Sequence, residues 1–187
     1  YGNLAEIALS RDRWAEAHRW FDLARDAAEI AGDRKALAFT HGGLGDLAVD
    51  EGNLDAALAH YRRAETLFAA AGSRYVHGVR LNAALASLLR GRAAAAQRIF
   101  REHLAREGGR DRLLDAQAHL GLALLAAGEG AWAGDEGWDG EVEAAARALA
   151  GRHEIRGILL LLIDRAAEVA EAAGERERAR SVRALAG

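Results

Sequence analysis

A residue pattern that occurs twice, forty residues apart, constrains the fold of this chain more than any other feature. Each copy has a Leu-Ala or Leu-Gly pair and an alanine three residues after it. Further along, a second alanine is followed four positions later by an aromatic residue. The first copy comprises Tyr1, Leu4, Ala5, Ala8, Ala17 and Phe21, and the second comprises His41, Leu44, Gly45, Ala48, Ala57 and Tyr61. A repeated unit of this size cannot bury its apolar face alone, so neighbouring units are expected to stack into a solenoid.

The composition indicates that these units are helical. Of the 187 residues 51% are hydrophobic, and many of these are alanine, which is the best helix former. Proline is absent, and runs rich in Val, Ile and Thr are missing, so no residue interrupts a helix by lacking a donor and no segment favours a strand. We therefore predict an all-α fold.

Glycine marks the joints between the expected helices. A glycine followed by Asp or Asn, as at Gly32-Asp33 and Gly52-Asn53, can close one helix and cap the next. Short joints of this kind place consecutive helices side by side. The sequence predicts ten helices in five antiparallel pairs, over residues 3–10, 14–31, 34–50, 54–71, 75–89, 93–107, 111–127, 141–150, 154–173 and 176–185.

The repeated positions resemble the tetratricopeptide repeat, whose signature joins an aromatic residue, a Leu-Gly pair and a later Ala and Phe. The second copy matches best, through Leu44, Gly45, Gly52, Ala57, Tyr61 and Ala64, and the first matches through Leu4, Ala5, Trp14, Ala17, Phe21 and Ala24. Weaker copies contain Ala83, Ala84, Gly91, Ala96 and Phe100, then Leu120, Gly121 and Gly128, and finally Gly174 and Ala179. The resemblance implies a right-handed α-solenoid of about five helix pairs, spanning residues 1–187 as one domain, that binds proteins or peptides without catalysis.

Two features depart from the common repeat. The units recur at close to 40 residues rather than 34, and glycine turns replace the proline that usually ends a unit. Longer units resemble the repeat arrays at the C-terminal ends of large bacterial signal-responsive transcription regulators. This second resemblance implies a sensor or scaffold part of a larger bacterial regulatory protein. The sequence contains no methionine, so we expect it to be a fragment of a longer chain.

The charge pattern argues against nucleic acid and membrane partners. The net charge is −3, and arginines alternate with acids, as in Glu175-Arg176-Glu177-Arg178, which is typical of solvated helix faces. The longest apolar run, from Ile158 to Ile163, is far shorter than the roughly 20 residues that cross a bilayer. There is no cysteine for a disulfide framework. We expect a cytoplasmic protein with no direct contact to nucleic acid or membrane.

Motifs for cofactor or metal chemistry are missing. The seven histidines never lie three or four residues apart, so no helix turn offers a metal-binding pair. A calcium loop counted from Asp135 has Gly137 at its third place and Ala146 at its twelfth, where ligands are needed. Neither a phosphate-binding Gly-Lys-Ser/Thr nor a hydrolase Gly-x-Ser-x-Gly occurs. We therefore predict no metal, no cofactor and no catalytic residues.

In stacked helical hairpins the first helices line the concave wall, and residues that flank the close-contact Gly or Ala point into it. This register predicts a partner-binding groove formed by Asn3, Glu6, Asp46, Asp50, Asn82, Leu85, His119 and Leu122. In this family asparagines at that place often hold the main chain of an extended ligand, which implies the same role for Asn3 and Asn82. The acids would suit Arg or Lys and the leucines an apolar side chain. Alternatively, the asparagines are solvated and the leucines belong to the core.

Two segments depart from the repeat. The Gly/Trp-rich segment 128–140 replaces a tight turn, and its Trp132 and Trp138 either fold back onto the solenoid or form a binding loop. The run from Ile158 to Ile163 is apolar all round its helix and is expected to be buried. Two alternative functions follow: a structural module that forms homodimers through the latter segment, or an all-α enzyme with a site near Trp132 and Trp138.

Overall fold

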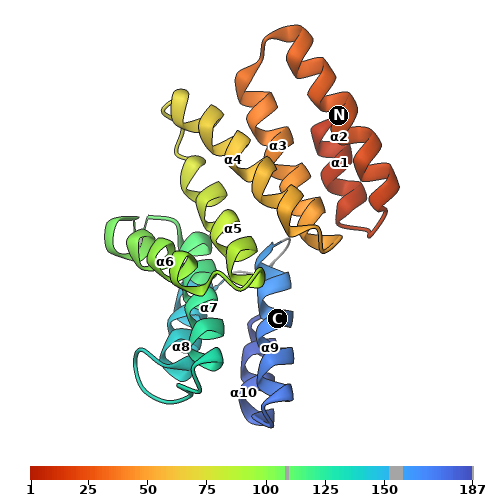
Figure 1. The fold of residues 1–187 in the computed structure, drawn as a ribbon. Helices are drawn as coiled ribbons and strands as arrows, with labels where there is room; N and C mark the ends of the chain where they lie inside the picture. The colour runs from red at the N-terminus through yellow and green to blue at the C-terminus, as the bar shows by residue number, and fades with distance from the viewer. Residues whose placement is uncertain (108–109, 152–157, 187) are drawn as a thin grey trace. The chain divides into compact units, whose positions relative to one another are not determined.

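The computed structural model describes residues 1–107, 110–151 and 158–186, and within these ranges it contains α-helices and no β-strand. Figure 1 shows the helices and the short segments that join them. The helices are α1 (Gly2–Leu9), α2 (Trp14–Ala31), α3 (Arg34–Asp50), α4 (Leu54–Ala70), α5 (Val76–Leu89), α6 (Ala93–Glu107), α7 (Arg112–Gly128), α8 (Trp138–Leu149), α9 (Ile158–Ala172) and α10 (Arg176–Arg183), followed by a short 3-10 turn, η1 (Ala184–Ala186). The predicted all-α class is confirmed.

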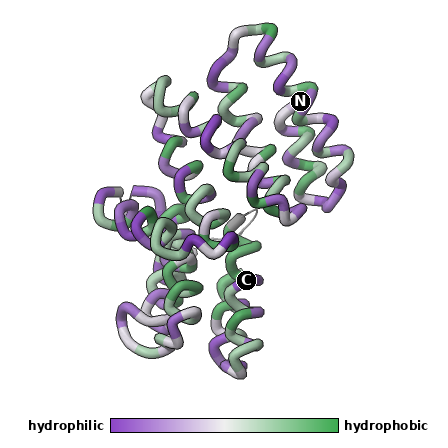
Figure 2. The backbone as a smooth tube through the Cα atoms, viewed as in Figure 1, coloured by the Kyte–Doolittle hydropathy of each residue, from purple (hydrophilic) through white to green (hydrophobic). Residues whose placement is uncertain are grey.

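The chain divides into two compact units, Tyr1–Gly91 and Arg92–Gly187. In the first unit every helix contacts the helix that follows it in the chain, as expected for stacked hairpins. Along the helices hydrophobic residues alternate with hydrophilic ones, so each helix has an apolar side for its neighbours (Figure 2). The single-domain organisation predicted from the repeats stays a prediction.

Glycines and polar caps set the helix ends of the first unit. Gly32 has a left-handed backbone with φ of 65°, which lets the chain leave α2 without the strain that a side chain would cause. The Asp33 side chain then accepts hydrogen bonds from the backbone N–H groups of Lys35 and Ala36 at the start of α3. Asn53 caps α4 through the N–H of Ala56. The helix boundaries predicted from these signals hold here to within one residue at each end.

The core of the first unit forms where the small residues of one helix meet the aromatic rings of another. Ala5, Ala8, Ala17, Phe21, Leu44 and Leu47 make one buried cluster, with Leu9 and Trp20 packed against it. A Cβ atom at Gly43 would lie 2.4 Å from the Phe21 ring, and one at Gly45 would lie 2.4 Å from the Tyr61 ring. Glycine therefore permits the close approach of these helices, as the repeat pattern predicts for Gly45.

The second unit repeats this device. Its helix α7 contacts α6, α8 and α9, and α9 contacts α10. A Cβ atom at Gly121 of α7 would lie 2.5 Å from the ring of Phe100 on α6, which matches the predicted close contact at Gly121. Leu120 and Ala123 are fully buried beside it.

The start of α8 differs from the sequence prediction. The helix begins at Trp138, three residues before the predicted start at Glu141, because the Trp138 side chain is only 1% exposed and anchors the first turn. Ahead of it the chain folds back: the Trp138 N–H donates to the Ala131 carbonyl at 2.9 Å, and the ring of Trp132 packs 5.4 Å from that of Trp138. The two tryptophans thus pack onto their own unit.

The apolar run in α9 is buried on most of its surface. Leu159, Leu162 and Ile163 are buried, whereas the Leu160 side chain is 38% exposed. The predicted helix start at Glu154 lies outside the described residues, as does the structure of residues 152–157. Leu160 is therefore the described residue of this run that presents most apolar surface for the homodimer alternative.

Candidate functional site

A hydrogen-bond network centred on Asp46 joins three helices of the first unit. The Tyr61 hydroxyl of α4 donates to Asp46 Oδ1 at 2.7 Å, and Asn82 Nδ2 of α5 donates to the same oxygen at 3.0 Å. Asp46 lies on α3, next to the close-contact Gly45. Two of the predicted groove residues, Asp46 and Asn82, therefore lie together although 36 positions separate them in the chain.

Carboxylates concentrate negative potential around this network. Burial is the main cause that raises the pKa of Asp46, to about 7, and the neighbouring charges of Glu6 and Asp50 raise it further against the hydrogen bonds from Tyr61 and Asn82. The pKa of Glu6 is also raised by burial, and that of Asp50 by burial and by the charges of Asp12 and Glu51. Because the charges of Glu6 and Asp50 disfavour ionisation of Asp46, a cation placed beside Asp46 would favour its ionised form.

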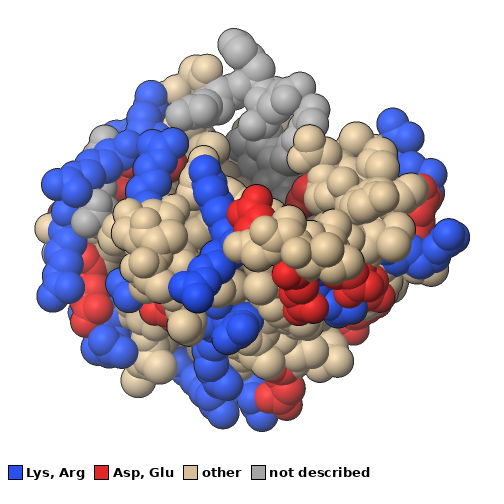
Figure 3. All heavy atoms as spheres, turned by 90° about the horizontal axis from the view of Figure 1, so that it is seen from above, with Lys and Arg blue, Asp and Glu red and all other residues tan. Residues whose placement is uncertain are grey.

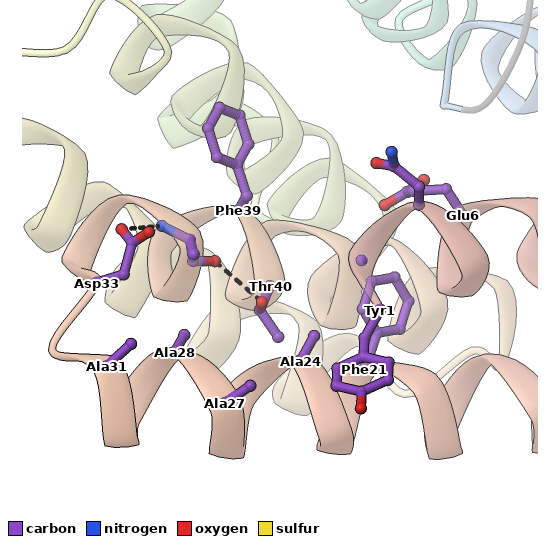
Figure 4. Close-up of a pocket in the computed structure, with 13 residues that line it drawn as sticks. Tyr1, Glu6, Phe21, Ala24, Ala27, Ala28, Ala31, Asp33, Phe39 and Thr40 are labelled. Atoms are coloured by element: carbon purple, nitrogen blue, oxygen red, sulfur yellow. Dashed lines mark hydrogen bonds between the residues drawn. The ribbon is translucent and has the colours of Figure 1, made fainter.

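An open pocket of about 620 Å³ lies between α1, α2 and α3, and of the acids described above its lining includes Glu6. Figure 4 shows its alanine floor on α2, formed by Ala24, Ala27, Ala28 and Ala31, with Tyr1, Glu6, Phe21 and Phe39 around it. Asn3 and Glu6 both contribute to the lining. The pocket thus combines an apolar floor of small residues with a polar edge on α1.

The predicted groove residues of the first unit differ in how much they offer a partner. Asn3 is exposed and lines the pocket, whereas the Asn82 amide is engaged by Asp46. Leu85, at 1% exposure, lies in the core, which agrees with the alternative that the leucines are core residues. Asp50 is exposed at the end of α3. Asn3, Glu6 and Asp50 therefore remain the accessible part of the predicted set, whereas Asp46 is partly buried and already accepts two hydrogen bonds.

The two predicted groove residues of the second unit also differ. Leu122 is 6% exposed and packs in the core of that unit. His119 is partly buried, and its Nδ1 lies 2.6 Å from Glu141 Oε2 on α8. One turn earlier on α7, Asp115 contacts His103 Nε2 at 3.0 Å. These two histidine–carboxylate contacts tie α7 to α8 and to α6.

Sequence reasoning missed the polar role of Tyr61, which it assigned to packing alone. The ring does fill the space beside Gly45, but its hydroxyl also holds Asp46. A signal was available, since the first copy of the repeat has Phe21 at this place and a phenylalanine has no hydroxyl. The second copy thus has both a tyrosine hydroxyl and Asp46, whereas the first copy has Glu6 at the position that corresponds to Asp46.

A second, smaller cavity of about 270 Å³ lies in the second unit beside Trp138, Val142 and Ser181. At its edge Arg178 of α10 donates to both carboxylate oxygens of Asp139 at 2.7 Å and stacks over the Trp132 ring at 5.8 Å. The guanidinium and the carboxylate thus satisfy each other. Within the described ranges no cluster of three or more His, Asp or Glu side chains has a geometry suited to a metal ion.

Figure 3 shows basic and acidic side chains on the same face, among large areas of uncharged residues. Ion pairs between exposed or half-buried side chains include Arg25 with Asp22 and Arg80 with Glu65. Among the described residues, none of the helices combines the length and the apolar character that crossing a bilayer requires.

These features define an α-helical repeat protein, in which small residues of one helix receive an aromatic ring from its neighbour. Residues 1–70 match the family model of the tetratricopeptide repeat, which covers the two copies of the pattern that resemble it best. This part of the chain is thus similar to the tetratricopeptide repeat family, whose members generally mediate protein–protein interaction. A search of curated proteins gives no match.

Proposed function

We propose that the chain is a non-catalytic module that binds a protein or an extended peptide through the first unit, as part of a larger cytoplasmic bacterial regulatory protein. The observation that carries the binding proposal is the open 620 Å³ pocket, whose lining includes Asn3 and Glu6, two of the residues predicted from the repeat register. The family match over residues 1–70 supports the same class of function.

The chemistry of the site favours a partner that has a basic residue next to an apolar one. Glu6, Asp46 and Asp50 would attract an Arg or Lys side chain. The alanine floor on α2 would receive an aliphatic or aromatic side chain, because small residues leave room above it. Asn3 would add a hydrogen bond to the partner's main chain.

Binding rather than catalysis is supported by how the polar groups are engaged. Asp46 accepts from Tyr61 and Asn82, and the pocket floor consists of alanine, which has no reactive group. A ligand that spans α1 and α3 would change the packing of the first hairpin on the second. Such a change in curvature is how the signal would pass to the rest of the protein.

The test uses the purified chain and a random peptide library displayed on phage, followed by fluorescence anisotropy with the enriched peptides. Enriched peptides are expected to contain Arg or Lys beside Leu, Phe or Trp. Ala27→Phe should fill the pocket and weaken binding at least tenfold. Ala59→Phe on the exposed side of α4, outside the pocket, is the matched control and should bind as the unmodified protein does.

Two results would overturn the proposal. One is equal binding by the Ala27→Phe and Ala59→Phe variants, which would place the ligand elsewhere on the chain. The other is that no peptide is enriched above a helical control protein, which would exclude capture of an extended peptide. A loss of the basic preference in Glu6→Gln would assign the charge selectivity to the α1 edge.

A further inference from the structure

Two histidines face each other on the first unit, apart from the Asp46 network. His41 of α3 and His60 of α4 lie with their Nδ1 atoms 3.1 Å apart, and their ring centroids are 5.4 Å apart. The rings therefore point at each other, and one Nδ1 must carry the hydrogen while the other accepts it. Both rings are partly buried. This contact joins the two helices of the second hairpin.

The first hairpin holds a different pair at the same place. Tyr1 and Trp20 lie forty residues before His41 and His60, and their rings stack with centroids 6.0 Å apart and an angle of 16°. The comparison within one chain shows that this joint needs only ring packing. In the second hairpin two ionisable rings take the place of a pair that stays neutral at physiological pH.

The groups around the histidines oppose the uptake of protons. Arg63 on α4 and Arg25 on α2 act on His41, and Arg25 and His18 of α2 act on His60. Asp22 and Asp26 pair with Arg25, and Glu51 pairs with His18 at 2.8 Å, which offsets part of this positive charge. The arginines nevertheless disfavour a proton on either ring.

We propose that the His41–His60 contact is a proton-sensitive joint that holds α3 against α4 while the rings share one hydrogen bond and releases them when both are protonated. One added proton leaves an N–H donor and a lone pair in contact. The second removes the only acceptor and sets two cationic rings against each other. The joint therefore opens in acid, whereas the Tyr1–Trp20 joint of the first hairpin does not.

The direction of the effect follows from the pKa values. Burial, then His60, Arg63 and Arg25, lowers the pKa of His41 to about 4, and burial with Arg25 and His18 lowers the pKa of His60. The unfolded chain takes up these protons near pH 6.5. The stability contributed by the neutral pair is therefore complete above about pH 6.5 and is lost as the pH falls toward about 4.

The direct test is a pH titration of the histidine ring nitrogens by ¹⁵N NMR on the full chain. Near neutral pH one of His41 and His60 should be the Nδ1–H tautomer and the other the Nε2–H tautomer. Both rings should titrate below pH 6.5, with His41 near pH 4. Identical tautomers for the two rings, together with titration near pH 6.5, would overturn the proposal.

Variants add a second readout. Replacing the pair by the rings of the first hairpin, in His41→Tyr/His60→Trp, should reduce the fall in Tm between pH 7 and pH 5 by about 2–4 °C, the size of a modest electrostatic contribution in a chain of this length. His18→Gln keeps both rings and removes only one of the smaller causes that lower the pKa of His60, so this variant should retain most of the fall. An unchanged fall in the double variant would contradict the joint.

Arg63→Gln tests the same inference without touching the joint, in case the double variant does not fold. Removing this guanidinium should raise the pKa at which His41 titrates. If the pKa of His41 is the same in Arg63→Gln and in the unmodified protein, the His41 ring does not lie close to Arg63, and the inference is contradicted.

Discussion

Single glycines decide how closely the helices of the first unit pack. Helix α3 carries Gly42, Gly43 and Gly45, and their surroundings differ. A Cβ atom would meet the Phe21 ring at Gly43 and the Tyr61 ring at Gly45, whereas at Gly42 it would meet no described atom within 4 Å. Neighbouring positions of one helix thus differ in whether there is room for a side chain.

We expect opposite effects on stability from the same substitution. Gly43→Ala and Gly45→Ala should each destabilise the protein by about 1–3 kcal/mol, because buried aromatic rings must move. Gly42→Ala should stabilise it by about 0.5–1 kcal/mol, since alanine loses less backbone entropy in a helix. Urea unfolding followed by circular dichroism measures all three. Destabilisation by Gly42→Ala would show that this side of α3 is closely packed.

Asp46 makes the stability of the protein depend on pH. Its pKa is about 7 in the folded chain, above the value of 3.8 for the free side chain, so the folded state holds the proton longer than the unfolded one does. The stability from the protonated carboxyl is present below about pH 4 and is lost as the pH rises toward 7. Asp46→Asn should keep the hydrogen bonds accepted from Tyr61 and Asn82 and stabilise the protein at pH 8 by about 1–2 kcal/mol. This is less than the full pKa shift of Asp46 implies, because the Asp46 side chain is partly exposed.

The measurement is a series of urea unfolding curves between pH 4 and pH 8. The difference between Asp46→Asn and the unmodified protein should vanish toward pH 4. Asp55→Asn, an exposed acid on α4, serves as control and should show no such rise with pH. A constant difference at every pH would mean that Asp46 acts through hydrogen bonding alone.

At the scale of elements, the segment before α8 depends on one tryptophan and one glycine. Trp138 is buried in the first turn of α8, and Trp138→Ala should destabilise the second unit by about 3–5 kcal/mol. Trp132→Ala should have a smaller effect, because that ring is partly exposed. Thermal unfolding of the two variants gives the comparison, and equal losses would show that Trp132 contributes as much to the packing.

Gly140 tests the backbone of the same segment. A Cβ atom there would lie 2.2 Å from the Asp135 carbonyl oxygen, and backbone cannot move aside as a flexible side chain does. Gly140→Ala should therefore lower Tm. Gly128→Ala at the end of α7 is the matched control, since no described atom lies within 4 Å of its Cβ position. If both variants unfold at the same temperature, the observed return of the chain at Asp135 is not required for stability.

The helices themselves follow closely from local signals. Glycine with a following Asp or Asn marked the ends of α2 and the starts of α3 and α4, and α2, α3 and α6 have their predicted bounds. These signals did not predict the start of α8, because the helix has no side-chain cap and the sequence suggested that Gly140 interrupts a helix. Tertiary burial of Trp138 decides that boundary.

At the scale of the whole molecule, the two compact units imply that a destabilising substitution mainly affects the unit that contains it. Stacked repeats interact with their neighbours, so a variant in one unit should loosen that unit first. Gly45→Ala should reduce amide hydrogen-exchange protection within Tyr1–Gly91, and Trp138→Ala within Arg92–Gly187. Equal loss of protection in both units from either variant would show that they unfold together.

The candidate site could be predicted only in part from the sequence. Repeat register gave Asn3, Glu6 and Asp46, because positions beside the close-contact residue recur with the period of the helix pairs. It could not show that Asn82 and Tyr61 both hold Asp46, since these contacts depend on side-chain directions across three helices. Nor could it separate Leu85 in the core from a leucine on a binding wall.

Helix α3 contacts each of the other four helices of the first unit, α1, α2, α4 and α5. It provides the main packing that joins the pair formed by α1 and α2 to the pair formed by α4 and α5. Neither pair can bury its apolar face alone. The three glycines of α3 also make it a helix with little tendency to form alone. Helix α3 therefore forms only in contact with its neighbours, and the neighbours pack through α3. This mutual dependence couples all five helices into one cooperative unfolding transition.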